Sequence, residues 1–293
     1  MLKAEAPAKI NLHLAVLDKR PDGFHNLESV FITLDFADTI YFEHIPGKNS
    51  LELCMDAAGF DLPVEKNIIF RALSLFRSKT GLDTGLKITA KKRIPAGGGL
   101  GGGSSDAAST LLALNKLAGF PLNRDELLEL AASLGSDVPF FVHETAAARV
   151  SGAGGLIEPL EAPRCFFVLV NPGFPSDTAA AYRLLDEYRC GKPCGKGDSH
   201  LFHEMFKGEP REWPFYNDFL PVFPGREKSV YQNIISQLRK HGAEFASLSG
   251  AGSTCFGVFK EKAQAEKAAA VLRSEWSFVE LSQPKSPPLK TAG

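Results

Sequence analysis

Residues 94–108 read IPAGGGLGGGSSDAA, and this stretch decides how the rest of the chain is interpreted. A strand pattern at 86–90 leads into it, and an Ala/Leu-rich helix pattern runs from Ser104 to about Ala118. Glycines before a helix let backbone amides and the positive end of the helix dipole approach phosphate oxygens. A hinge or tight turn is the alternative, but six glycines between 97 and 103 carry an entropic cost that a turn does not require. The stretch therefore predicts a phosphate-binding loop.

The residues around the glycines exclude several known classes of phosphate-binding loop. Gly97, Gly99 and Gly102 satisfy the dinucleotide fingerprint, but a second helix pattern stands where that fold needs a strand ending in an acidic residue. The P-loop also fails, because Ser104 stands where a lysine must follow the last glycine. The lysine, catalytic-loop and metal-binding signatures of protein kinases do not occur either. The sequence thus indicates a nucleotide site of another class.

Length and composition are those of an ordinary globular protein. The 293 residues suggest two modest domains or one large α/β domain, and 44% of them are hydrophobic and 23% charged. The sequence contains no apolar run of about eighteen residues that would span a membrane. A formal net charge of -1 argues against broad electrostatic attraction to nucleic acid. We therefore expect neither a membrane nor a nucleic acid as partner.

The amino terminus and the cysteines indicate a reducing compartment. Residues 1–7 lack the long apolar core of a secretory signal, so a cytoplasmic location is expected. The five cysteines are odd in number and lack the paired spacing of zinc ribbons. They are interpreted as thiols, and no structural metal is expected.

Periodicity predicts an α+β chain in two halves. Strands are expected at 29–36, 39–44, 86–90 and 165–170, and a strand pair at 245–259 is split by Gly250, Ala251 and Gly252. Helices are expected at 67–79, 104–118, 123–135, 178–188, 229–241 and 262–276. Glycines and prolines between about 146 and 163 are expected to break any regular element and to mark the boundary between the halves. Residues 190–225 are interpreted as irregular.

Three motifs in order resemble the GHMP kinase superfamily and cover nearly the whole chain. They are PAKINLHL at 7–14, the glycine stretch at 94–108 and LSGAGSTCFGVF at 248–259. The resemblance implies a two-domain α+β architecture. Residues 1–155 would form an ATP-binding domain similar to domain 2 of ribosomal protein S5, and residues 156–285 a ferredoxin-like C-terminal domain.

Two further segments narrow the activity that the resemblance implies. RPDGFHNLESVF at 20–31 and LGSDVPFFV at 134–142 resemble the members that transfer the ATP γ-phosphate, with Mg²⁺, to the 2-hydroxyl of a cytidine-diphosphate-linked methylerythritol in non-mevalonate isoprenoid synthesis. The alternatives are another GHMP kinase, acting on homoserine, galactose or mevalonate, and a nucleotide-binding regulator that has lost catalysis. The presence of both Lys9 and Asp137 argues against the inactive form. A monomer or weak homodimer is expected.

The resemblance implies that Asp137 and Lys9 are the catalytic residues. Phosphoryl transfer needs a base for the hydroxyl proton, and Asp137 suits this role, although a cap or turn residue before Pro139 is the alternative. Lys9 lies in an apolar segment, where an unpaired ammonium is costly, so a partner such as Asp137 is implied; a lysine reaching solvent is the alternative. Asn11, on the same strand face as Lys9, would bind the substrate near the reacting hydroxyl or be structural.

Other positions match the binding residues of the family. Phe24 and His25 would hold the cytosine by stacking and by hydrogen bonds, although family members often carry Tyr at the first position. Tyr182 would stack on the base or lie in the core, and Thr178 would lie near the substrate. Ser105 would contact phosphate or the magnesium ion. The residues implied to bind ATP are Asn67, Lys92, Pro95, Ala96, Gly97, Gly98, Gly99, Leu100, Gly101, Gly102, Gly103, Ser104 and Ser105.

Overall fold

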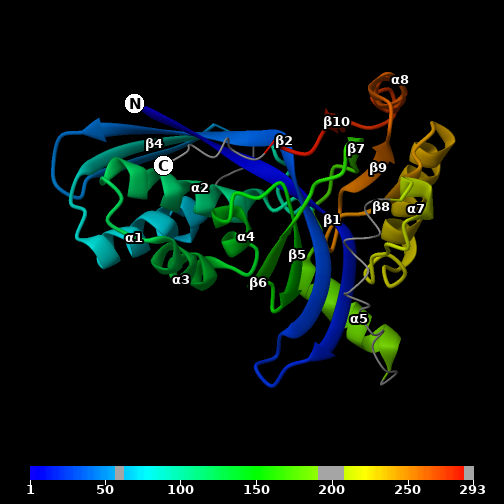
Figure 1. The fold of residues 1–293 in the computed structure, drawn as a ribbon, viewed down its shortest axis with the longest axis horizontal. Coiled ribbons are helices and arrows are strands. Elements are labelled where there is room, and N and C mark those ends of the chain that lie inside the picture. Colours follow the sequence, from blue (N-terminus) through cyan, green and yellow to red (C-terminus); the bar gives the residue numbers. More distant parts are fainter. Residues whose placement is uncertain (57–62, 191–207, 287–293) are drawn as a thin grey trace. The chain divides into compact units, whose positions relative to one another are not determined.

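The computed structural model describes residues 1–56, 63–190 and 208–286. The chain forms two compact units (Figure 1). Unit 1 comprises Met1–Ala8, Ala37–Ile94 and Gly101–Glu144, and unit 2 comprises Lys9–Phe36, Pro95–Leu100 and Thr145–Gly293. The chain passes between them repeatedly, because strands β1 (Leu2–Lys19) and β2 (His25–Ile45) and the glycine loop each contribute to both. The boundary at residues 155/156 between an N-terminal and a C-terminal family domain stays a prediction.

In its described residues, unit 1 combines a mixed sheet with helices α1 to α4. β4 (Gly85–Lys91) pairs antiparallel with the second half of β2 and parallel with β3 (Leu51–Asp56). The helices are α1 (Ile68–Thr80), α2 (Gly102–Leu117), α3 (Arg124–Leu134) and α4 (Val138–Val142), and a short 3-10 helix (Val64–Lys66) precedes them. α1 packs against both α2 and α3, and α2 also packs against α4. The helices expected at 67–79, 104–118 and 123–135 are confirmed, with ends shifted by at most two residues.

Unit 2 is built around a four-stranded antiparallel sheet. Its strands are β7 (Phe166–Asn171), β8 (Phe245–Leu248), β9 (Cys255–Phe259) and β10 (Phe278–Ser282), in the spatial order β10-β7-β9-β8. The described residues of this unit include the helices α5 (Thr178–Arg189), α7 (Gly225–Lys240) and α8 (Lys262–Leu272) and a 3-10 helix at Pro210–Glu212. α7 packs on β8 and β9, and α8 on β7 and β10. Counted along the chain within this sheet, the strands lie in the spatial order 4-1-3-2. This is the order of a ferredoxin-like domain, as predicted.

Two predictions about strands are wrong. Residues 146–163 were expected to break regular structure, but they form the hairpin of β5 (Ala147–Gly152) and β6 (Leu156–Leu160), and β5 pairs with the first half of β2. The glycines lie at the hairpin turn, where Gly152 and Gly154 have positive φ. Pro159 lies in β6, the last strand of the order β3-β4-β2-β5-β6, where an edge position tolerates proline. The strands expected at 29–36 and 39–44 are one continuous strand, β2.

The remaining expectations about membranes and cysteines are tested only in the described residues. None of the helices there has both the length and the apolar character needed to cross a membrane. Cys54, Cys165, Cys190 and Cys255 are free thiols, and Cys194 lies outside the described residues.

Candidate active site

The carbonyl oxygens of three loop glycines accept hydrogen bonds from Ser176 and from the turn between β8 and β9 in unit 2. The hydrogen bonds run from Ser176 N to Gly97 O (2.9 Å), from Thr254 N to Gly98 O (3.1 Å) and from Ser249 Oγ to Gly99 O (2.8 Å). Lys9 N donates in the same way to Leu100 O at 2.9 Å. Carbonyl oxygens repel an anion, so bonding them within the protein favours phosphate binding at the loop.

The loop is packed so closely that one of its positions admits only glycine. Gly99 has a φ of 74°, and a Cβ atom built there would lie 2.1 Å from the carbonyl oxygen of Ser249. The last two glycines, expected in the loop, form the first turn of α2, and Gly101 is its N-cap in a left-handed conformation. The amides at a helix start have no helical acceptor, and among the described residues no side chain caps this one. The first turn of α2 therefore offers amides to an anion.

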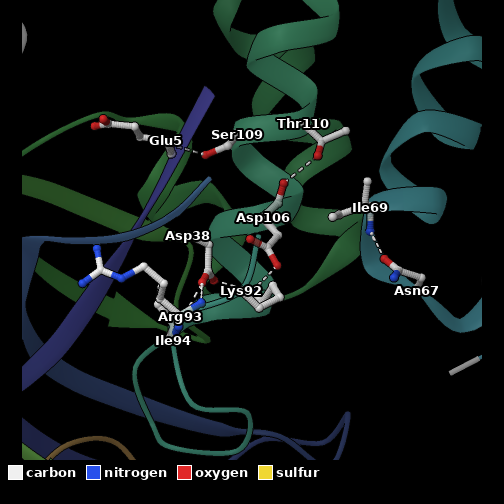
Figure 2. A network of polar contacts seen from close by, with 10 residues as sticks. All are labelled: Glu5, Asp38, Asn67, Ile69, Lys92, Arg93, Ile94, Asp106, Ser109 and Thr110. Carbon is white, nitrogen blue, oxygen red and sulfur yellow. Dashed lines mark hydrogen bonds and ion pairs between the residues drawn. The ribbon is translucent and has the colours of Figure 1, made fainter. Parts of the chain in front are cut away.

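A buried charged cluster in unit 1 lies beside the start of α2 (Figure 2). The Lys92 ammonium pairs with the carboxylates of both Asp38 and Asp106, and the three side chains are 5%, 0% and 4% exposed. Burial raises the pKa of the Asp106 carboxyl to about 7, because Lys92 offsets the desolvation only in part and Asp38 adds to it. Sequence reasoning missed Asp38, although a charged residue within an apolar strand pattern was a usable signal.

Two oxygen atoms at the start of α2 remain open to a ligand. Ser105 Oγ and Asp106 Oδ1 are buried and have no hydrogen-bond partner among the described residues. Buried polar atoms are nearly always bonded, and hard oxygens of this kind suit a magnesium ion. Asn67, by contrast, uses its side-chain oxygen to cap α1, where Ile69 N donates to it at 2.9 Å (Figure 2).

Lys9 and Asn11 lie together in unit 2. The Lys9 side chain is buried, its ammonium donates to Asn11 Oδ1 at 2.5 Å, and it lies 4.4 Å from the centroid of the Phe31 ring. Asn11 Nδ2 in turn donates to Ser29 Oγ at 3.0 Å. This arrangement contradicts the alternative of a lysine that reaches solvent. It holds the ammonium in one place, where it can neutralise a developing negative charge.

Asp137 belongs to unit 1 and precedes α4. It occupies the N-cap position of that helix, yet its side chain accepts no capping hydrogen bond from the helix. The interpretation of Asp137 as a helix cap therefore finds no support, because the cap function depends on such a bond. The five residues of α4 are all buried, which fixes the backbone that carries Asp137.

The residues expected to bind the cytosine form an aromatic cluster in unit 2. The rings of His25 and Tyr182 are stacked, with centroids 5.1 Å apart and planes 18° apart. His25 Nε2 lies 2.8 Å from Asp186 Oδ1 and donates to it, since a carboxylate only accepts. Phe24 is 67% exposed. Thr178, at the first position of α5, is also exposed.

Asp186 was not predicted, although it lies one helical turn after Tyr182. Positions four apart share a helix face, so the spacing could have revealed it. Burial works to raise the pKa of the Asp186 carboxyl, but hydrogen bonds from Lys19 and His25 outweigh burial and hold the pKa below its usual range. The contact with Asp186 fixes the orientation of the His25 ring.

The comparisons with known proteins agree with this geometry. Residues 67–145 match the model of the GHMP kinases N terminal domain, and residues 207–277 match that of the GHMP kinases C terminal. The chain belongs to the GHMP kinase family, and it is an ATP-dependent small-molecule kinase. The predicted family, two-domain architecture and enzyme class are thereby confirmed.

The chain's relatives carry one particular name. A 4-diphosphocytidyl-2-C-methyl-D-erythritol kinase of Syntrophus aciditrophicus (strain SB) is 39% identical over 93% of this chain and 95% of its own length. The enzyme of the same name from Thermodesulfovibrio yellowstonii is 35% identical, over 95% of this chain and 97% of its own. A crystal structure of 4-(cytidine 5'-diphospho)-2C-methyl-D-erythritol kinase has a TM-score of 0.81 and 31% identity, over 97% and 100% of the two chains. A homoserine kinase from Cytophaga hutchinsonii shares the fold, with a TM-score of 0.73 at 16% identity over 97% and 94% of the two chains.

Proposed function

We propose that this enzyme transfers the γ-phosphate of ATP to the 2-hydroxyl of 4-diphosphocytidyl-2-C-methyl-D-erythritol, in the non-mevalonate route to isoprenoid precursors. The observation that carries the proposal is the His25, Tyr182 and Asp186 cluster, because homoserine, mevalonate and galactose, unlike the cytidyl substrate, carry no base that such a cluster would bind. The names of relatives that are 35–39% identical support the same substrate.

The cytosine would be bound through shape and hydrogen bonding. His25 Nε2 is committed to Asp186, so the imidazole offers Nδ1 as an acceptor, and the exocyclic amine of cytosine is a donor. The exposed Phe24 ring supplies a surface on which a base can stack, and the Tyr182 ring, stacked on His25, would orient the imidazole. Thr178 is proposed to lie near the same substrate.

The phosphoryl transfer would be carried by Asp137 and Lys9. The substrate hydroxyl oxygen attacks the γ-phosphorus, the bond from that phosphorus to the β-phosphate oxygen breaks, and ADP leaves. Asp137 accepts the hydroxyl proton, a role worth about a hundredfold to ten-thousandfold in rate. Lys9, buried and oriented by Asn11, neutralises negative charge on the transferred group.

ATP and Mg²⁺ would be held at the glycine loop and the start of α2. The loop amides and the first turn of α2 are proposed to bind the phosphates. The Ser105 hydroxyl is proposed to hold the magnesium ion, because its oxygen and Asp106 Oδ1 are buried without a partner among the described residues. The ion would neutralise phosphate charge during transfer. The cytoplasmic location and the monomeric or weakly dimeric state stay predictions.

The experiment that tests the proposal is a coupled ADP-release assay with Mg²⁺ and ATP. We expect turnover with 4-diphosphocytidyl-2-C-methyl-D-erythritol and none with homoserine, mevalonate or galactose. Turnover with one of these instead would assign another GHMP kinase activity, and nucleotide binding without any turnover would indicate a regulator. Asp137→Asn is expected to lose at least about a hundredfold in kcat while still binding ATP; a rate near wild type would show that Asp137 is not the base.

A further inference from the structure

Asp38 lies in β2, in the middle of the chain's longest strand, and its carboxylate is directed at the entry to the glycine loop. Its side chain is fully buried. Asp38 Oδ1 accepts hydrogen bonds from two consecutive backbone amides, Arg93 N at 2.5 Å and Ile94 N at 2.9 Å (Figure 2). These amides directly precede Pro95, where the loop begins. One carboxylate oxygen thus fixes the backbone at the loop entry.

The other oxygen of Asp38 reaches the loop exit through a lysine. Asp38 Oδ2 pairs with the Lys92 ammonium, which also pairs with Asp106 near the start of α2. The exit is further held by packing, since a Cβ atom at Gly102 would lie 2.9 Å from Ile94 Cγ2 and 3.6 Å from Asp38 Oδ2. Entry and exit of the loop therefore meet in one buried group of charges.

The electrostatics make this cluster sensitive to the loss of one partner. Two carboxylates and one ammonium are almost completely removed from water, where an uncompensated charge is far more costly than at the surface. Hydrogen bonds that involve an ion are shorter and stronger than neutral ones. Replacing the Asp38 carboxylate by a neutral group removes one of the two charge-assisted bonds of Lys92, and with it the link between the loop entry and the loop exit.

We propose that Asp38 is a positioning residue for ATP, which sets the geometry of the phosphate loop through Lys92 and the amides of residues 93 and 94 without touching the nucleotide. This inference rests on the proposed function, because it takes the loop to be the ATP site. The family resemblance assigned Lys92 to the nucleotide itself, whereas here its ammonium links two carboxylates of the chain.

The test compares two isosteric variants on the same strand. Asp38→Asn keeps an oxygen for the two backbone amides but removes the Asp38 charge, so that Lys92 stays paired with the Asp106 carboxylate. Asp35→Asn is the matched control, because Asp35 Oδ1 also accepts a backbone amide, Gln283 N at 3.0 Å, away from the loop. For Asp38→Asn we expect the Kd of a nonhydrolysable ATP analogue and the KM for ATP to rise about tenfold, the loss of one charge-assisted bond. The KM for the cytidyl substrate should stay within about twofold, and the control should match the wild type.

Hydrogen exchange separates positioning from a general structural role. In Asp38→Asn, amides of residues 93–105 should exchange faster, and those of the β5–β6 hairpin should not change. A folded variant with an unchanged Kd for the ATP analogue would overturn the inference, even if its Tm fell. If Asp38→Asn does not fold, Asp38→Glu, which keeps the charge but lengthens the side chain, carries the same expectation. The Kd of the ATP analogue is measured without turnover. A wild-type protein that binds the analogue but shows no activity would therefore refute the proposed function, and the test of Asp38 would still apply.

Discussion

Replacing Gly99 by alanine should distort the phosphate loop. The φ of 74° at this position is one that residues with a Cβ adopt at a cost of about 1–2 kcal/mol. The new methyl would also lie 2.1 Å from Ser249 O and 2.8 Å from Gly252 O, so the backbone must shift. Overpacking of this kind costs about 1–3 kcal/mol. Together the two effects predict a loss of about 2–5 kcal/mol in unfolding free energy.

Thermal and urea unfolding, with titration of a nonhydrolysable ATP analogue, would measure this effect. A chain of this size changes its Tm by about 2–4 °C per kcal/mol, so Gly99→Ala should lower the Tm by on the order of 10 °C. Binding of the analogue should weaken as well, because the shifted backbone moves the amides that are proposed to bind the phosphates. Gly155→Ala is the matched control, since a Cβ there would meet no atom within 4 Å.

The result that would refute the reasoning is a Gly99→Ala protein with the Tm and analogue affinity of the control. The loop would then tolerate a side chain, and the close packing of the loop against Ser249 could not be what fixes its shape. A lowered Tm with unchanged affinity would separate the two parts of the argument, because it would leave the packing correct and the link to phosphate wrong.

Three further predictions concern protonation, thiols and the base site. Burial lowers the pKa of His13 to about 4 in the folded protein, below its unfolded value of about 6.5. Below pH 6.5 the unfolded state therefore binds a proton that the folded state does not, and the free energy of unfolding should fall by about 3 kcal/mol between pH 6.5 and pH 4. Urea unfolding of His13→Asn should lack this decrease, and the same decrease in the variant would contradict the assignment. Iodoacetamide with mass spectrometry should modify exposed Cys54 in the native protein, whereas Cys165, whose pKa burial raises to about 12, and buried Cys255 should react only after unfolding. Tyr182→Ala should raise the KM for the cytidyl substrate about tenfold through lost stacking and leave the KM for ATP unchanged. Equal changes in both KM values would argue against a cytosine-binding site at Tyr182.

Local signals in the sequence predicted much of the fold correctly. The helix expected at 123–135 begins with a capping box, whose two bonds run from Glu126 N to Asn123 Oδ1 and from Asn123 N to Glu126 Oε2, each 3.0 Å long. Such bonds join residues three apart, so the chain needs no distant partner to make them. The hairpin at 147–160 was missed because its glycines and proline are equally typical of loops, and only pairing with β2 makes them a sheet.

The sequence by itself predicted the phosphate loop and determined the family, because glycines before a helix, and motifs in fixed order, are properties of contiguous residues. Only the tertiary structure decided which charges lie together. Asp38 and Lys92 are 54 residues apart, and His25 and Asp186 are 161 apart, so no local pattern couples them. Their pairing follows from burial, since a charge removed from water must find an opposite charge or a hydrogen bond, and folding alone determines which one is within reach.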